Sequence, residues 1–121
     1  MAKLCDNENA TKYWSSRQED YVAKFLSART QPGSGAGKFK KSDVDAGTFL
    51  VECKTSTKEK EQFSIKKDWL EKLKYEALMN HKPCCALAFN FGAQENNNYF
   101  ILDESTFLDM KTVYDEFLEK Q

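Results

Sequence analysis

Histidine is almost absent from this sequence of 121 residues, since His81 is the only one. A zinc site built from several histidines is therefore excluded, and any Ser-His-Asp or Cys-His mechanism would have to use His81. The segment around His81 runs into Pro83, where a helix should end, and a cationic side chain suits the C-terminal end of a helix. We expect His81 at such a surface position, which leaves carboxylates, lysine and a bound cation for any chemistry.

The C-x-x-C spacing of cysteines and apolar runs long enough to span a membrane are missing as well. The four cysteines contain no C-x-x-C spacing, so they predict neither a disulfide framework nor a zinc knuckle. The longest uninterrupted apolar run covers only residues 84–89, which is too short to cross a membrane. Residues 1–10 lack the apolar segment of a secretory signal. We therefore expect a cytoplasmic protein with no membrane partner.

The length and composition are typical of one globular domain. A chain of 121 residues is near the commonest domain size, and 40% hydrophobic with 31% charged residues argues against disorder. We expect a single domain over residues 1–121, in which the polar residues 1–14 are flexible.

The net charge of −1 hides an uneven distribution. Residues 38–94 carry eleven basic and eight acidic side chains, whereas residues 95–121 carry two and seven. The lysines that stand out in the basic part are Lys38, Lys40, Lys41, Lys66 and Lys67. A lysine cluster is weak evidence for phosphate binding, because runs of like charge are usually solvated faces.

Apolar spacing and turn residues predict the order of secondary structure. The expected elements are a helix at 16–28, a glycine loop at 31–37, strands at 40–45 and 48–54, a helix from 64 to before Pro83, strands at 84–91 and 99–102, and a helix from about 106. This order indicates an α/β protein, or an α+β protein with a central mixed sheet flanked by helices.

Three of these elements carry more specific expectations. Ser16-Arg17-Gln18-Glu19 matches a capping box, which would start the first helix at Ser16. The apolar run at 84–91 is typical of a central strand that is covered on both faces. The last helix has an apolar stripe that we expect to face inward, formed by Phe107, Met110, Val113, Phe117 and Leu118.

Gly37-Lys38 resembles the end of a phosphate-binding P-loop, but the spacing does not fit. The first glycine of G-x-x-x-x-G-K-[ST] would fall on Pro32, and the magnesium-binding hydroxyl would fall on Phe39. We therefore expect no nucleotide cofactor. A glycine loop still lets the backbone approach a ligand closely, so this loop is a candidate DNA-facing segment.

A hairpin with two carboxylates and a lysine is the segment richest in chemistry. If its turn is centred on Ala46-Gly47, Asp43 faces Leu50 and is diagonal to Glu52. Side chains alternate between the two faces of a strand, so Asp43, Glu52 and Lys54 would share the side away from the core.

Two carboxylates on one patch repel each other unless a cation lies between them. A hard divalent cation such as Mg²⁺ suits a site with few carboxylates and several waters. Lys54 could then orient or deprotonate the attacking water, or balance charge in a pentavalent transition state. The alternative is an ordinary surface strand with an ion pair, because the spacing D-x8-E-x-K is short and recurs by chance.

Asp43…Glu52-x-Lys54 resembles the core motif of the PD-(D/E)XK nucleases, with Ser42 in place of the usual proline. More specifically, the motifs follow the order seen in archaeal-type Holliday junction resolvases and their small phage-encoded relatives. They are Arg17-Gln18-Glu19, Pro32-Gly33-Ser34-Gly35-Ala36, Asp43-Val44, Val51-Glu52-Cys53-Lys54-Thr55, and the helix from Ser64 with Leu70, Leu73, Glu76 and Ala77. The resemblance covers residues 15–91; each motif alone is weak, but together and in order they are fairly specific.

The resemblance implies a restriction-endonuclease-like core and a role for each matching residue. Asp43 and Glu52 would bind Mg²⁺, for which Mn²⁺ could substitute, together with the backbone carbonyl of Cys53 and the carboxylate of Glu19. Lys54 would be the catalytic lysine. Glu19 has a second interpretation, because the capping box already accounts for it.

The resemblance also implies contacts to DNA. Ser34 would act in a mobile loop at the scissile region, and Arg17 would lie near the phosphates; Ser34 could equally be only a small loop residue. With the lysines, the candidate DNA-binding residues are Arg17, Ser34, Lys38, Lys40, Lys41, Lys66 and Lys67.

The expected function is that of a magnesium-dependent endonuclease acting on branched DNA as a homodimer. Resolving a four-way junction needs two symmetric cuts, whereas one chain has one Asp43…Glu52-x-Lys54 set, so a two-fold dimer would supply the second. Candidate interface residues are Trp69, Tyr75, Phe107, Tyr114 and Phe117, which are also candidate core residues. The alternatives are a nuclease that nicks flap or duplex DNA, a non-catalytic DNA-binding module, and an interaction protein whose acidic last helix docks a partner.

Overall fold

The computed structural model describes residues 8–27, 29–30, 43–92 and 97–121. Side chains at 8–12, 29–30 and 43 are outside this description. The elements in chain order are α1 (Glu8–Phe25), β1 (Arg29–Thr30), β2 (Asp43–Ala46), β3 (Phe49–Lys54), α2 (Lys67–Met79), β4 (Cys84–Phe89), β5 (Tyr99–Ile101) and α3 (Glu104–Glu119).

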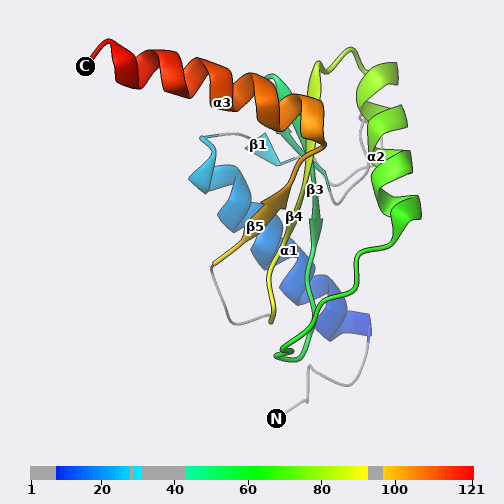
Figure 1. The fold of residues 1–121 in the computed structure, drawn as a ribbon. Helices are drawn as coiled ribbons and strands as arrows, with labels where there is room; N and C mark the ends of the chain where they lie inside the picture. Colours follow the sequence, from blue (N-terminus) through cyan, green and yellow to red (C-terminus); the bar gives the residue numbers. More distant parts are fainter. Residues whose placement is uncertain (1–7, 28, 31–42, 93–96) are drawn as a thin grey trace.

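The strands form one mixed sheet in the order β1-β2-β3-β4-β5, in which β1 adds only two residues to four main strands. β3 and β4 are parallel, whereas the other neighbouring pairs are antiparallel. α1 lies on one side of the sheet and α2 on the other (Figure 1). The fold is therefore α+β with a mixed sheet flanked by helices, as predicted. No helix in the described ranges combines the length and apolar character needed to cross a membrane.

Both faces of the central strands are buried, which corrects one expectation. Val51 and Cys53 pack against α1, and Leu50 packs on the opposite face against α2. Alternation of side chains along β3 is therefore present, but neither face is open to solvent. The prediction that Glu52 lies on a solvent-exposed face is wrong, because α2 covers that face of β3. The prediction that the run at 84–91 forms a central strand covered on both faces is confirmed by β4.

The register of the β2–β3 hairpin also differs from the prediction, by two residues. Ala46 pairs with Phe49, so the turn is Gly47-Thr48, and Asp43 is the direct partner of Glu52 instead of Leu50. Gly47 has a φ of +73°, while Ser27 and His81 are the only other described residues with positive φ. Positive φ at the first central residue alone is the pattern of a type II′ turn, which matches the twist of the two strands.

Helix starts are the least accurate part of the predicted secondary structure. α1 begins at Glu8, so Ser16 lies inside the helix and the capping-box interpretation of Ser16 and Glu19 is wrong. Residues 8–14 are helical, which also corrects the expected flexible segment over that range. α2 begins at Lys67, after Lys66 as N-cap, and not at Ser64. A capping-box spacing is equally compatible with two residues one turn apart in a helix interior, which explains the error.

The last helix does not pack its apolar face inward, contrary to the prediction. None of residues 104–119 is buried. α3 leaves the sheet at the end of β5 and runs out to the C terminus as an arm (Figure 1). Amphipathic spacing predicts a helix with an apolar face, but it does not say which surface covers that face.

Asp103 is the N-cap of α3 and makes the start of this helix sensitive to acid. Its Oδ1 accepts a hydrogen bond of 2.9 Å from the Thr106 backbone N–H. The pKa of Asp103 is lowered from 3.8 to about 2. The main causes are hydrogen bonds to its carboxylate from the side chain of Thr106 and then from the backbone of Thr106. The folded-state pKa is depressed, so the cap contributes fully above pH 3.8 and is lost as the pH falls through about 2.

Asp103→Asn should remove this acid sensitivity while keeping the cap, because asparagine caps helices without titrating. Asp103→Ala should destabilise the start of α3 by about 1 kcal/mol at neutral pH. Amide exchange of residues 104–108 at several pH values measures both effects. Equal protection in Asp103→Ala and the wild type would mean that the cap does not hold the helix start.

Candidate active site

Glu52 is a buried carboxylate in the middle of the protein. It lies on β3, and the residue is only 3% exposed. Its Oε2 is 3.0 Å from the Lys54 Nζ. Its Oε1 is buried and accepts no hydrogen bond from any residue that the structure describes. Burying a charged oxygen without a partner is costly, so this atom is a candidate ligand position.

Lys54 ends β3 and brings its ammonium back to Glu52. The Lys54 Nζ also lies 4.5 Å from the centre of the Trp69 ring on α2, so the cation is held between a carboxylate and an aromatic face. Its side chain remains 28% exposed, which keeps the amine accessible from solvent. Trp69 packs against the core cluster under α2, as predicted for a core residue, and it also contributes to this site.

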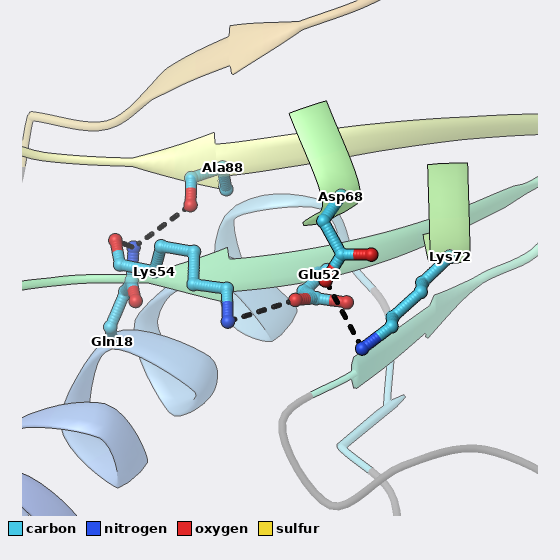
Figure 2. A network of polar contacts seen from close by, with 6 residues as sticks. All are labelled: Gln18, Glu52, Lys54, Asp68, Lys72 and Ala88. Carbon is cyan, nitrogen blue, oxygen red and sulfur yellow. Dashed lines mark hydrogen bonds and ion pairs between the residues drawn. The ribbon is translucent and has the colours of Figure 1, made fainter. Parts of the chain in front are cut away.

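Figure 2 shows this pair together with a second ion pair, which is formed by Asp68 and Lys72 of α2. The Lys72 Nζ is 3.1 Å from the Asp68 Oδ2, and both side chains are largely exposed. Asp68 lies in the first turn of α2, where an acidic residue suits the helix dipole. The sequence interpretation did not single out Asp68, because helix-start acids are common.

The structure brings Asp43 next to Glu52 along the backbone. Asp43 is the first residue of β2, and its Cα partner across the antiparallel ladder is Glu52. The predicted diagonal arrangement is thus replaced by direct pairing. The Asp43 side chain and the candidate DNA-binding residues Ser34, Lys38, Lys40 and Lys41 lie outside the part of the chain that is described.

The remaining predicted site residues are found on α1, β3 and the start of α2. Glu19 is half-buried, and Arg17 is exposed with its guanidinium 5.5 Å from the centre of the Trp14 ring. Lys66 and Lys67 are exposed, and the Lys66 Nζ is 5.7 Å from the centre of the Trp69 ring. The Cys53 side chain packs on the α1 side of the sheet, so only its backbone is suited to join Glu52.

Gln18 on α1 bonds to the strand end that carries Lys54, and the sequence interpretation did not select it as a site residue. Its Nε2 donates to the Lys54 carbonyl at 2.8 Å and to the Asn98 Oδ1 at 2.9 Å, and the residue is 5% exposed. Figure 2 shows its amide directed to the ends of β3 and β4. Gln18 precedes the buried Val22 by four residues, so a polar residue on the apolar stripe of α1 was the available signal.

A small buried polar network continues from Gln18. The Asn98 Oδ1 also accepts from the Asn90 Nδ2 at 3.3 Å, and the Asn90 Oδ1 accepts from the Thr55 Oγ1 at 2.7 Å. These residues follow or adjoin the ends of the parallel strands β3 and β4. The network therefore ties α1 to the strand end that carries Lys54.

Gln18→Glu should destabilise the protein at neutral pH by about 2 kcal/mol or more, because it points a buried carboxylate at the Lys54 carbonyl oxygen. The folded-state pKa of the new carboxyl should be raised, so the loss of stability should grow as the pH rises from about 4 to 7. Urea unfolding at both pH values measures this. Glu19→Gln is the matched control, and a similar pH dependence in both variants would contradict the assigned role of Gln18.

The described side chains around Glu52 offer few ligands for a divalent cation. Among the side chains that the structure describes, no three His, Cys, Asp or Glu residues gather into a metal site. The orphaned Glu52 Oε1 nevertheless fits one ligand position, and Asp43 is its backbone partner. Carboxylate and carbonyl oxygens are the ligands that hard divalent cations prefer. The residues present are therefore compatible with such a cation.

No family model matches this chain, and neither the curated proteins nor the solved structures include a match. The relation to the PD-(D/E)XK nucleases therefore stays a prediction from the motifs. The function has to be inferred from the residues of the site themselves.

Proposed function

We propose that this protein is a Mg²⁺-dependent endonuclease with a restriction-endonuclease-like core that hydrolyses phosphodiester bonds in branched DNA. The observation that carries the proposal is the Glu52–Lys54 pair: Glu52 is buried with one carboxylate oxygen unpartnered among the described residues, and Lys54 is held 3.0 Å from the other. An ordinary surface ion pair does not bury its carboxylate. The buried Glu52 carboxylate has one oxygen left for a cation, next to the Lys54 amine.

The proposed ligands are the carboxylates of Asp43, Glu52 and Glu19 with the backbone carbonyl of Cys53. A divalent cation held there would act as a Lewis acid on the phosphodiester. Lys54 is then the catalytic lysine, and its ammonium balances the charge that develops on the phosphate in the transition state. Glu52 and Trp69 hold that ammonium from two sides, which limits its motion before the reaction.

DNA contacts in this proposal come from Arg17 and from the lysines at the start of α2. Lys66 is exposed near Trp69, so a phosphate bound there would lie beside the Glu52–Lys54 pair. Lys67 is the next exposed lysine, and its Nζ is 3.8 Å from the Glu71 Oε2. Ser34, Lys38, Lys40 and Lys41 are proposed to complete the binding surface. Because one chain has one such set, we propose that a homodimer makes the paired cuts of a Holliday junction.

Cleavage of a labelled four-way junction tests the proposal against a linear duplex of matched sequence. With Mg²⁺ or Mn²⁺, the junction should be cut symmetrically in two opposed strands, and EDTA should abolish cutting. Faster cleavage of the duplex or of a flap would replace the resolvase assignment with a nicking nuclease. Cation-dependent cleavage of none of these substrates would reject the nuclease proposal.

A further inference from the structure

The apolar face of α3 is the largest feature that the proposed site leaves unexplained. Six residues of this face, here called the α3 stripe, are Phe107, Met110, Val113, Tyr114, Phe117 and Leu118. Each is between 48% and 66% exposed. All of them except Leu118 line a groove of about 800 Å³, to which Leu102, Asp109 and Lys111 also contribute. Since none of residues 104–119 is buried, α3 has an apolar face without an internal cover.

The spacing within the stripe is compatible with the pairing of α3 with another helix. Phe107, Met110, Tyr114 and Phe117 follow one another at intervals of three, four and three residues. These are the a and d positions of two successive heptads, which form the seam between two helices.

The charges of α3 are placed so that two copies can approach each other. The five acidic residues are Glu104, Asp109, Asp115, Glu116 and Glu119. At about 100° per residue, all of them project at least roughly 100° away from the centre of the stripe. Lys111 flanks the stripe and is 2.7 Å from Asp115, which neutralises one of the acids. The net negative charge of the helix is therefore kept out of the seam, and like-charge repulsion between copies is limited.

The open area is near that needed for a stable pair. Aromatic side chains offer roughly 150–250 Å² each, so the half-exposed stripe leaves on the order of 600 Å² of apolar surface open. Leu102 and Met110 connect it to a second hollow, of about 320 Å³, that is also lined by Phe25 and Phe100. Phe25 is 63% exposed and extends the surface. The largest apolar patch of a monomer is typically about 300–600 Å², so the open surface of α3 with Phe25 is at or above the top of that range. A standard interface takes roughly 800 Å² from each partner, which is close to this area.

We propose that the α3 stripe is a self-association surface, on which α3 of a second copy of this chain packs across a two-fold axis. The same stripe then serves both subunits, as an isologous interface requires. This pairing extends the homodimer of the proposed function, but its evidence comes from α3 alone and uses no residue of the candidate active site.

Sedimentation velocity of the full chain, at 1 to 100 micromolar and without DNA or metal, tests the interface. The wild type should form a dimer, and Tyr114→Asp should weaken dimerisation by about 30-fold or more, since it places a charge in the centre of the seam. Leu108→Asp is the matched control: Leu108 is also 60% exposed on α3 but lies on the opposite side of the helix. It should dimerise like the wild type.

A cross-linking experiment keeps the test valid if Tyr114→Asp unfolds α3. A benzophenone amino acid at position 114 should give covalent dimers on irradiation, whereas the same group at position 108 should not. A monomeric wild type, equal dissociation by both aspartate variants, or cross-linked products of monomer mass only would overturn the proposal. An inactive dimer would reject the nuclease and leave the interface standing, and an active monomer would do the reverse.

Discussion

Lys54→Met is expected to lower the free energy of unfolding by about 3 kcal/mol at neutral pH, because it leaves Glu52 as a buried carboxylate without a counter-charge. The Glu52 side chain is 4% exposed and cannot recover hydration by a simple rotation, whereas Lys54 is 28% exposed. Glu52→Gln should therefore cost less than about 1 kcal/mol, since the freed ammonium can turn to solvent and a neutral amide is cheaper to bury.

The double variant Glu52→Gln, Lys54→Met should recover most of the stability that Lys54→Met loses. Urea unfolding of the four proteins gives the coupling between the two positions as a double-mutant cycle. Lys72→Met is a control for the loss of a lysine from an ion pair, because its partner Asp68 is exposed, and it should change stability by less than about 1 kcal/mol. Equal costs for Lys54→Met and Glu52→Gln would show that Glu52 does not depend on Lys54.

Cleavage should fall by roughly a thousandfold or more in both Glu52→Gln and Lys54→Met, but for different reasons. Glu52→Gln should weaken binding of Mg²⁺ or Mn²⁺, as should Asp43→Asn, because each removes a negative ligand. Lys54→Met should bind the cation and DNA almost normally and fail in turnover, since it removes a group that acts in the transition state.

Calorimetric titration with Mn²⁺ and single-turnover cleavage separate these two effects. Both are to be measured below the unfolding temperature of Lys54→Met, so that lost stability is not counted as lost activity. Lys72→Met is again the control and should cleave at the wild-type rate. Undiminished cation binding in Glu52→Gln would remove Glu52 from the ligand set, and normal cleavage by Lys54→Met would reject its catalytic role.

Local patterns in the sequence were sufficient for the four main strands and for the class of the fold, whereas the two-residue strand β1 was not predicted. The run at 84–91 predicts a central strand because nearly all of its residues are apolar, and β4 has that place. The strand expected at 99–102 is β5, which pairs antiparallel with β4, and the helix expected to end before Pro83 is α2. Such patterns are reliable because burial on one or two faces is written directly into the residue types.

The candidate site was only partly accessible in this way. Glu52 and Lys54 were identified from their spacing, but the residues that hold Lys54 come from α1 and α2, which are far away in the chain. Gln18 and Trp69 could not be assigned to Lys54 from sequence, because a polar or aromatic residue on a helix can face many surfaces. The exact pairing of Asp43 with Glu52 depended on a turn at Gly47-Thr48, where a shift by one position moves the register by two residues.

The sequence by itself therefore determined the order of the helices and main strands, and it singled out Asp43, Glu52 and Lys54 as a candidate set. The tertiary structure alone decided that α2 covers the face of β3 with Glu52, which turns an apparent surface carboxylate into a buried one. It also decided that α3 extends from the body with its apolar face open. The physical reason is the same for both: a periodic pattern states that a face is apolar or polar, whereas the element that covers it is set by long-range packing.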